Sequence, residues 1–392
     1  MTRSAQPVVA VVGGGQLARM MAPAAVGLGV HLRVLVEAPG SSAAQAVADA
    51  PVGAAADEAA VRSLVAGADV LTVEHEHVPG ALLDALADEG LPVHPGRAAL
   101  AHAQDKVVMR RRLGALGVPC PDWAPVPDAA ALDAFLAAHG GTAVVKTARG
   151  GYDGKGVRVV GRSSDVADWL AAAADGSGAA LLVEEKVPFT RELAVLVARR
   201  PSGEVRVWPV VASTQVDGVC AEVVAPAPDL HPETGAAAEA LAVQVAEGLG
   251  VTGVLAVELF EVADPDGGAP RVLVNELAMR PHNSGHWTLD GSVTSQFEQH
   301  LRAVLDLPLG ATDVRAPWTV MVNVLGSTLP DLAAALPDVL ADPGVKVHLY
   351  GKDVRPGRKL GHVNVVGDDL PDLLRRGRAA AALLRGEVVA DG

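Results

Sequence analysis

Two glutamates lie inside apolar runs in the second half of the chain. Glu258 stands within residues 254–260, and Glu276 stands beside Asn275 within residues 272–277. A carboxylate in such a run is costly to bury unless a positive group meets it, and two on adjacent strands raise each other's pKa. Because Mg2+ prefers oxygen ligands and leaves room for waters and phosphates, we expect the pair to hold magnesium. The alternative is that each charge faces solvent on a half-exposed sheet.

A donor-rich loop follows the second glutamate. It contains Arg280, His282 and Asn283 close together. Such donors suit a small oxyanion, such as bicarbonate, a carboxylate or a transferred phosphoryl group. We therefore expect catalytic residues in this loop.

A glycine-rich segment between two expected strands is the next candidate site. It contains Lys146, Gly150, Gly151, Tyr152, Asp153, Gly154, Lys155 and Gly156. It is not a Walker loop, because a glycine follows Lys155 and no helix is expected after it. Such a segment is either a plain flexible hairpin or a mobile lid whose backbone amides close over phosphates. The flanking lysines favour the phosphate lid.

Charged residues also stand where one expected strand ends and the next begins. These residues are Glu184, Glu185, Lys186, Val187 and Glu192. Backbone groups in such a segment can hydrogen-bond adenine, while a carboxylate takes the ribose hydroxyls. Taken singly, the same residues are ordinary solvated charges at a strand end.

The chain begins with a strand-to-helix turn of glycines. Residues 13–18 fit the pattern GxGxxA, and Glu37 stands near the end of the second expected strand, where a dinucleotide enzyme holds a ribose. Glycines let the backbone approach an anion, and the helix N-terminus offers unpaired N–H groups. The pattern alone fits a nicotinamide or flavin site, or a tight turn in any Rossmann-like domain.

A basic loop at residues 350–359 is out of character for an acidic protein. It contains Lys352, Arg358 and Lys359. Such a loop suits the terminal phosphate of a small substrate, because Arg offers a planar fork and Lys a point charge. A solubilising turn is the alternative.

A run of alternating glutamate and histidine stands at residues 74–77. Alternation on a strand would put His75 and His77 on one face and Glu74 and Glu76 on the other. A zinc site lacks a third ligand nearby in sequence. We expect polar contacts at the carboxyl edge of the sheet, where ligands bind.

The bulk composition limits the class of protein. The chain has 392 residues, a formal net charge of -14 and only two cysteines, Cys120 and Cys220. The charge argues against a protein that coats nucleic acid, and the distant cysteines argue against a disulfide framework. No signal peptide or membrane span is recognisable in the sequence. We expect a soluble cytoplasmic protein that binds neither nucleic acid nor a membrane.

The expected elements place these candidates in an α/β chain. Strands alternate with helical segments over the first 100 residues, which predicts a parallel sheet. A helix beginning near Gln104 carries Lys106 and a basic cluster, Arg110, Arg111 and Arg112, and leads to a Pro-rich junction at residues 119–127. Later strands alternate in a way that predicts an antiparallel sheet with one buried face. The expected strands are residues 8–12, 30–37, 70–73, 143–147, 157–160, 181–185, 193–198, 205–211, 254–260, 272–277, 319–325 and 346–350.

The order of these segments resembles the ATP-grasp superfamily, and within it the N5-carboxyaminoimidazole ribonucleotide synthase family of purine biosynthesis. The residues that carry the resemblance are Gly-Gly-Gly-Gln-Leu-Ala-Arg-Met at 13–20, Gly-Gly-Tyr-Asp-Gly-Lys-Gly at 150–156 and Asn-Glu-Leu-Ala-Met-Arg-Pro-His-Asn-Ser-Gly-His-Trp-Thr at 275–288. The resemblance implies a Rossmann-like N-terminal domain at 1–103 and an ATP-grasp domain at 104–310 with a small lid at about 120–187. A small C-terminal domain follows at 311–392.

The resemblance also implies roles for individual residues. The residues expected to bind ATP are Lys106, Lys146, the glycine-rich loop 151–156, residues 184–187, Glu192, Gln215, Asn275 and Glu276. Gln215 departs from the family, in which a histidine is common at that position. Magnesium is expected on Glu258 and Glu276, and bicarbonate on Arg280, His282 and Asn283. The residues expected around 5-aminoimidazole ribonucleotide are Gln16, Leu17, Glu76, Tyr152 and Asp153, with Lys352 and either Arg358 or Lys359 on its phosphate.

The implied reaction is a carboxylation driven by ATP. Bicarbonate attacks the γ-phosphorus, carboxyphosphate breaks down to CO2, and the exocyclic amine of the nucleotide captures CO2 with help from Asp153. By analogy with the family, a homodimer is expected. The alternatives are another ATP-grasp ligase, such as formate-dependent glycinamide ribonucleotide formyltransferase, a nicotinamide-dependent dehydrogenase, and a non-catalytic nucleotide-binding regulator.

Overall fold

A computed structural model describes residues 6–151 and 154–387 of the chain. Its N-terminal part is a parallel three-stranded sheet in the order β2-β1-β3. Successive residues of β1 face opposite layers. Val9 and Val11 pack against α1, whereas Ala10 and Val12 pack in the core that contains α2 and α3. The elements are β1 (Val8–Val12), α1 (Gln16–Leu28), β2 (His31–Leu35), α2 (Glu58–Val65), β3 (Val70–Val73), α3 (Gly80–Asp88) and α4 (Arg97–Gln104).

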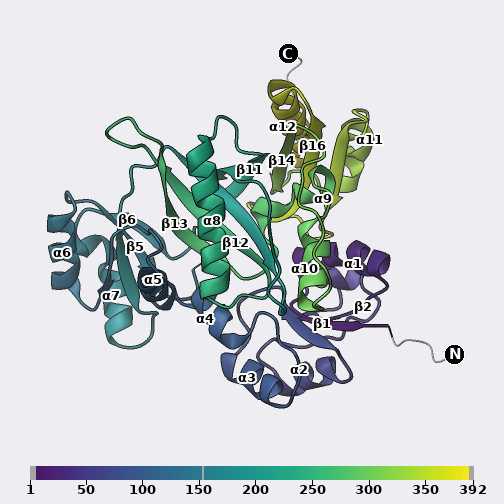
Figure 1. Ribbon diagram of the computed structural model, residues 1–392, viewed down its shortest axis with the longest axis horizontal. Coiled ribbons are helices and arrows are strands. Elements are labelled where there is room, and N and C mark those ends of the chain that lie inside the picture. The colour runs from purple at the N-terminus through teal and green to yellow at the C-terminus, as the bar shows by residue number, and fades with distance from the viewer. Residues whose placement is uncertain (1–5, 152–153, 388–392) are drawn as a thin grey trace.

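A small antiparallel sheet forms a separate lobe at the left of Figure 1. Its strand order is β4-β7-β5-β6, and α6 and α7 contribute apolar residues to its own core. Helix α5 (Lys106–Ala115) precedes this lobe, which we call the lid sheet. The lobe consists of β4 (Trp123–Val126), α6 (Ala129–Ala138), β5 (Ala143–Thr147), β6 (Val157–Val160), α7 (Ala167–Ala174) and β7 (Leu181–Glu185).

A nine-stranded sheet forms the body of the molecule. Its order is β13-β12-β8-β10-β11-β14-β16-β15, and β9 pairs with β8. β14, β16 and β15 join it through β11, so one sheet runs across the expected start of the C-terminal domain. The strands are β8 (Arg191–Arg199), β9 (Val205–Val207), β10 (Val211–Val216), β11 (Val219–Ala225), β12 (Gly253–Val262), β13 (Arg271–Ala278), β14 (Trp318–Leu325), β15 (Val345–Leu349) and β16 (Lys359–Gly367).

Helices cover the large sheet and join it to the N-terminal part. α8 shares one apolar core with β8 and β12, while α10 shares another with α1 (Figure 1). α12 packs on β14 and β16. These helices are α8 (Pro232–Gly248), α9 (Thr288–Gly291), α10 (Gln296–Val304), α11 (Leu336–Val339) and α12 (Leu370–Arg385). No helix in the described ranges is long and apolar enough to cross a membrane.

Three expectations about the strands were wrong. The single strand expected at 205–211 is two strands, because Pro209, which has no N–H to donate to a ladder, lies between Val207 and Val211. β4 lies inside the stretch interpreted as a Pro-rich junction. β11 and β16 were not expected from the sequence; β11 pairs with β14 to connect the two halves of the large sheet, and β16 pairs with β14 on its other side.

Candidate active site

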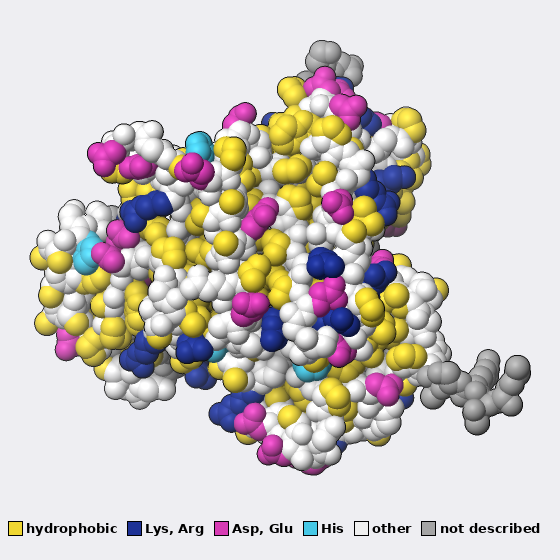
Figure 2. Space-filling view, viewed as in Figure 1, with side chains coloured by type: hydrophobic (Ala, Val, Ile, Leu, Met, Phe, Trp, Pro, Cys, Tyr) yellow, Lys and Arg dark blue, Asp and Glu magenta, His cyan; other side chains and the backbone are white. Residues whose placement is uncertain are grey.

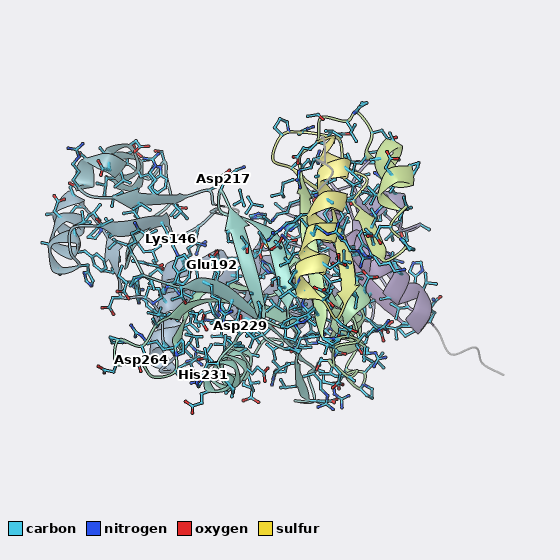
Figure 3. All side chains as sticks on the ribbon, turned by 90° about the horizontal axis from the view of Figure 1, so that it is seen from above. Lys146, Glu192, Asp217, Asp229, His231 and Asp264 are labelled. Carbon is cyan, nitrogen blue, oxygen red and sulfur yellow. The ribbon has the colours of Figure 1, made fainter. Side chains whose placement is uncertain are left out.

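A cavity of about 760 Å³ lies where the lid sheet meets the edge of the large sheet. Seen from above, Lys146 and Glu192 lie between the two lobes (Figure 3). The strands that bring these residues together are far apart in sequence. The predicted site residues that line the cavity are Glu76, Lys106, Lys146, Gly151, Gly154, Glu184, Glu185, Lys186, Val187, Glu192, Gln215, Glu258, Asn275, Glu276, Arg280, His282 and Asn283.

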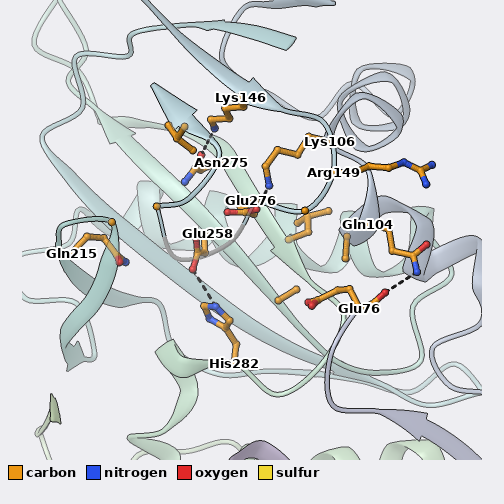
Figure 4. Close-up of a pocket in the computed structure, with 18 of the residues that line it drawn as sticks. Glu76, Gln104, Lys106, Lys146, Arg149, Gln215, Glu258, Asn275, Glu276 and His282 are labelled. Atoms are coloured by element: carbon orange, nitrogen blue, oxygen red, sulfur yellow. Dashed lines mark hydrogen bonds and ion pairs between the residues drawn. The ribbon is translucent and has the colours of Figure 1, made fainter. Parts of the chain in front are cut away.

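The two expected metal ligands face each other across neighbouring strands. Glu258 of β12 is paired in register with Glu276 of β13. Burial, together with the charge of Glu276, raises the pKa of Glu258 to about 8. In Figure 4, Lys106 contacts Glu276 while His282 contacts Glu258, at 3.3 Å. The buried pair therefore disfavours two negative charges, and a cation between the two side chains would let both carboxyls ionise.

The proton position on His282 follows from its neighbours. The backbone N–H of Ser284 donates to Nδ1 of His282 at 3.3 Å, so Nδ1 is an acceptor. Burial, together with the nearby Arg280, holds the pKa of His282 well below its usual range. The neutral ring therefore carries its proton on Nε2 and directs it at Glu258, which fixes the orientation of that carboxylate.

A second charged network stands on the lid side of the cavity. Glu184 on β7 contacts Lys146 on β5 at 2.7 Å, and Lys146 donates to the side-chain oxygen of Asn275 at 3.1 Å (Figure 4). Arg110 of α5 donates to the other oxygen of Glu184 at 2.8 Å. From the sequence, Arg110 was expected only as part of a basic cluster. Its spacing four residues after Lys106, on the same helix face, was the available signal.

The cavity continues into an apolar slot that the sequence analysis did not identify. Phe189 and Phe260 stack with ring centroids 4.6 Å apart, and Val144 and Val159 also line the space. Glu192, on β8, lines the same cavity, and burial raises its pKa. An apolar slot with carboxylates and backbone groups at its rim suits a planar base and a ribose.

The donor-rich loop lies at the opposite end of the cavity. Arg280 pairs with Glu76, at 2.9 Å, so the loop meets the N-terminal part of the chain. Asn283 is buried, and neither its amide nitrogen nor its amide oxygen has a hydrogen-bond partner among the described residues. Buried polar atoms of this kind call for a ligand or water.

A second group of predicted residues lies outside the cavity lining. Lys352 donates to the side-chain oxygen of Gln16, which joins the basic loop to the N-terminal glycine turn. Arg358 donates to the backbone oxygen of Asp353 at 3.2 Å, whereas Lys359 lines the cavity. The predicted residues not in the lining are Gln16, Leu17, Lys155, Gly156, Lys352 and Arg358. Tyr152 and Asp153 lie outside the described residues.

The expected alternation at residues 74–77 was wrong. β3 ends at Val73, so the run is not a strand and its side chains diverge. Glu74 is buried and accepts a hydrogen bond from the backbone N–H of Leu17 at 3.2 Å. His75 lies 3.6 Å from Glu37.

The glycine turn is occupied by a protein carboxylate. A side chain at Gly15 would collide with the carboxylate of Glu74, which sits at the N-terminus of α1. A dinucleotide pyrophosphate needs that same position. The dehydrogenase alternative therefore has no room for its cofactor at this turn.

The charged residues on one face of the described surface are mixed in sign. On the face in Figure 2, Lys and Arg are interspersed with Asp and Glu. Within residues 6–151 and 154–387, no group of three or more His, Cys, Asp or Glu could hold a metal ion. A cation between Glu258 and Glu276 would therefore complete its shell with water and phosphate oxygens, as Mg2+ does.

Family comparisons agree with this arrangement. The Ribonucleotide synthetase preATP-grasp domain matches residues 7–104, the ATP-grasp domain matches 111–297 and the Phosphoribosylaminoimidazole carboxylase C-terminal domain matches 319–376. The N5-carboxyaminoimidazole ribonucleotide synthase of Mycobacterium tuberculosis is 53% identical over 379 residues, which cover 96% of this chain and 87% of that protein. The chain belongs to the N5-carboxyaminoimidazole ribonucleotide synthase family.

Other members of this family are similar to this chain over nearly its whole length. The synthase of Corynebacterium ammoniagenes is 52% identical over 381 residues, or 96% of this chain and 92% of that protein. A crystal structure of the synthase of Aspergillus clavatus in complex with ADP and 5-aminoimidazole ribonucleotide is similar with a TM-score of 0.86 and 31% identity, and covers 97% of this chain and 98% of that one. The α/β ATP-grasp fold predicted from the sequence is confirmed.

Proposed function

We propose that the chain is an ATP-dependent carbon–nitrogen ligase that carboxylates 5-aminoimidazole ribonucleotide with bicarbonate in purine biosynthesis. The products are ADP, phosphate and N5-carboxyaminoimidazole ribonucleotide. The observation that carries the proposal is one cavity in which the carboxylates of Glu258 and Glu276 lie between a nucleotide-sized slot and the donor loop of Arg280.

ATP is assigned to the lid side of the cavity. The base would enter the apolar slot beside Phe260, with residues 184–187 at its edge and Glu192 near the ribose. Lys146 and Lys106 point their amines at the space between the two sheets, as Figure 4 shows. Two lysines and the amides of the glycine-rich loop would bind the phosphates and spread the charge of a loose transition state.

Magnesium fits the carboxylate pair. Carboxylate oxygens are hard ligands, and Glu258 and Glu276 supply them from paired positions on β12 and β13. When bound, magnesium would neutralise negative charge on the phosphate oxygens. His282 would keep Glu258 oriented through its Nε2 proton, and Lys106 would release Glu276 to the cation.

Bicarbonate is assigned to the donor loop. Arg280 offers a planar fork, and the unpartnered amide of Asn283 offers one further donor and one acceptor. Both line the same cavity as the metal pair, and Arg280 contacts Glu76 of the N-terminal part. Attack of a bicarbonate oxygen on the γ-phosphorus would give carboxyphosphate, which breaks down to CO2 and phosphate in a closed site.

5-Aminoimidazole ribonucleotide is assigned to the junction of the glycine turn and the basic loop. Lys352 and Gln16 would hold its phosphate end, with Lys359 closer to the cavity than Arg358. Its amine would then face the donor loop across Glu76. Asp153 remains the proposed proton acceptor, on family resemblance alone.

Phosphate release tests the proposal directly. The protein is incubated with ATP and magnesium, and bicarbonate or 5-aminoimidazole ribonucleotide is omitted in turn. Release should require both compounds. If formate and glycinamide ribonucleotide supported release instead, the chain would be the other ATP-grasp ligase considered above. ATP binding without release under any combination would indicate a regulator.

We further propose a cytoplasmic homodimer with domain boundaries near residues 103 and 310. These assignments rest on family resemblance. Analytical ultracentrifugation at micromolar concentration tests the dimer. A sedimentation coefficient typical of a 39.9 kDa monomer would contradict it.

A further inference from the structure

Arg110 is a fully buried charged side chain that the reaction described above does not use. It lies on α5, one helical turn after Lys106, and its side chain has no exposed surface. A buried guanidinium is costly unless all its donors are satisfied. Its partners therefore indicate what the residue does.

The guanidinium joins the lid sheet to the large sheet. Its Nε donates to Glu184 on β7 of the lid sheet at 2.8 Å. Its Nη1 and Nη2 donate to the backbone oxygens of Val274 and Asn275 on β13, at 2.9 Å and 2.7 Å. β13 is the edge strand of the large sheet, and Asn275 is left out of its register with β12 by a bulge, so neither residue is paired as in a regular central strand.

The contacts close a ring of side chains in the wall of the predicted ATP site. Arg110 donates to Glu184, and Glu184 contacts Lys146. Lys146 donates to the side-chain oxygen of Asn275, and the backbone oxygen of Asn275 accepts from Arg110. Burial by itself raises the pKa of Glu184, but Lys146 and Arg110 lower it to about 2. The carboxylate is therefore charged, and each of its two oxygens has a cation.

We propose that Arg110 is a positioning residue for ATP, which fixes Glu184 and thereby Lys146 relative to the strand that carries Asn275 and Glu276. One guanidinium sets the distance between the lid side and the metal side of the nucleotide site. The inference rests on the proposed ATP site. It does not depend on which acid or amine the enzyme uses.

Three variants separate this role from a general structural role. Arg110→Met keeps the length of the side chain and removes the charge and all three hydrogen bonds. Arg110→Lys keeps the charge beside Glu184 but not the planar fork. Arg112→Met is the matched control, because Arg112 lies on the same helix, is exposed and donates to the backbone oxygen of Gly248.

The readout is the dissociation constant of Mg-ADP, measured by calorimetry well below the melting temperature. We expect Arg110→Met to weaken binding about 10- to 100-fold, Arg110→Lys to recover part of the loss and Arg112→Met to bind within about twofold of wild type. Binding of 5-aminoimidazole ribonucleotide should change less than about twofold in all three. A purely structural role would weaken both ligands together.

A double variant tests whether the effect passes through Glu184. In a Glu184→Gln background, adding Arg110→Met should cost less than about threefold in Mg-ADP affinity, because the two changes interrupt one network. Additive losses, unchanged Mg-ADP affinity in Arg110→Met, or equal loss of both ligands would overturn the proposal. If wild type binds Mg-ADP but never releases phosphate with bicarbonate, the proposed function fails while this inference is still tested.

Discussion

The contact between the N-terminal sheet and the large sheet should weaken in acid because of one imidazole. His300 on α10 is fully buried. The backbone N–H of Val254 on β12 donates to its Nδ1 at 3.1 Å, and its Nε2 lies 2.9 Å from the hydroxyl of Thr72 on β3. The ring is therefore held as the neutral Nε2–H tautomer. Protonation would direct a second donor at the Val254 amide.

The size of the acid effect follows from the pKa. Burial, together with the charge of the nearby His94, lowers the pKa of His300 from 6.5 to about 3. The contribution of neutral His300 to the free energy of unfolding is complete well above pH 6.5. It is lost as pH falls, because His300 is protonated in the unfolded chain while it stays neutral in the folded chain. Between pH 7.5 and pH 5 the loss is about 2 kcal/mol from this residue.

The variant His300→Gln isolates this contribution. Glutamine keeps a donor for Thr72, cannot titrate and leaves the Val254 amide without its acceptor, so it should cost about 1–2 kcal/mol at pH 7.5. The difference in free energy of unfolding between wild type and variant should decrease by about 2 kcal/mol on acidification to pH 5. Urea unfolding followed by the fluorescence of buried Trp208 and Trp287 measures it.

Other buried imidazoles do not affect the comparison of wild type with His300→Gln. His286 and His362 are also buried with pKa values well below the usual range, mainly because of burial. They destabilise wild type and variant equally in acid, so their effect cancels in the difference. If His300→Gln loses as much stability as wild type between pH 7.5 and pH 5, the assignment of a neutral, pinned His300 is wrong.

Three substitutions test the proposed site. Glu276→Gln should lower ATP turnover at least about 100-fold at millimolar magnesium, because the cation loses a charged ligand. Normal turnover would contradict the assignment of Glu276 as a metal ligand. Lys352→Met should raise the KM for 5-aminoimidazole ribonucleotide about 10- to 100-fold and leave Mg-ADP affinity unchanged, while Lys346→Met, an exposed lysine on β15, serves as control. Arg280→Lys should raise the KM for bicarbonate about tenfold, because the planar guanidinium is lost. Steady-state phosphate release over a series of bicarbonate concentrations measures this KM. An unchanged KM would contradict a role of Arg280 in binding the oxyanion.

Local patterns were sufficient to predict most elements. The apolar runs around Glu258 and Glu276 are strands, and the turn after Val12 leads into a helix, as expected. These predictions held because periodicity and glycine placement act over a few residues. The strand expected at 205–211 failed because a single proline divides an otherwise apolar run.

Long-range pairing lay beyond the sequence. β16 was missed because its basic start resembles the end of a loop, yet it pairs with both β14 and β15 in the large sheet. The alternation at residues 74–77 was misread because tertiary contacts direct each side chain. Glu74 meets the helix amide of Leu17, and Glu76 meets Arg280.

The sequence by itself predicted an ATP-grasp ligase, because three short motifs resemble those of that superfamily and their glycines, carboxylates and donors are what phosphate and metal binding requires. The tertiary structure decided how those motifs combine. It placed Glu258 opposite Glu276, joined Gln16 to Lys352 across the whole chain and put Arg110 between two sheets. Such contacts depend on strand order and packing over hundreds of residues, and no local spacing specifies them.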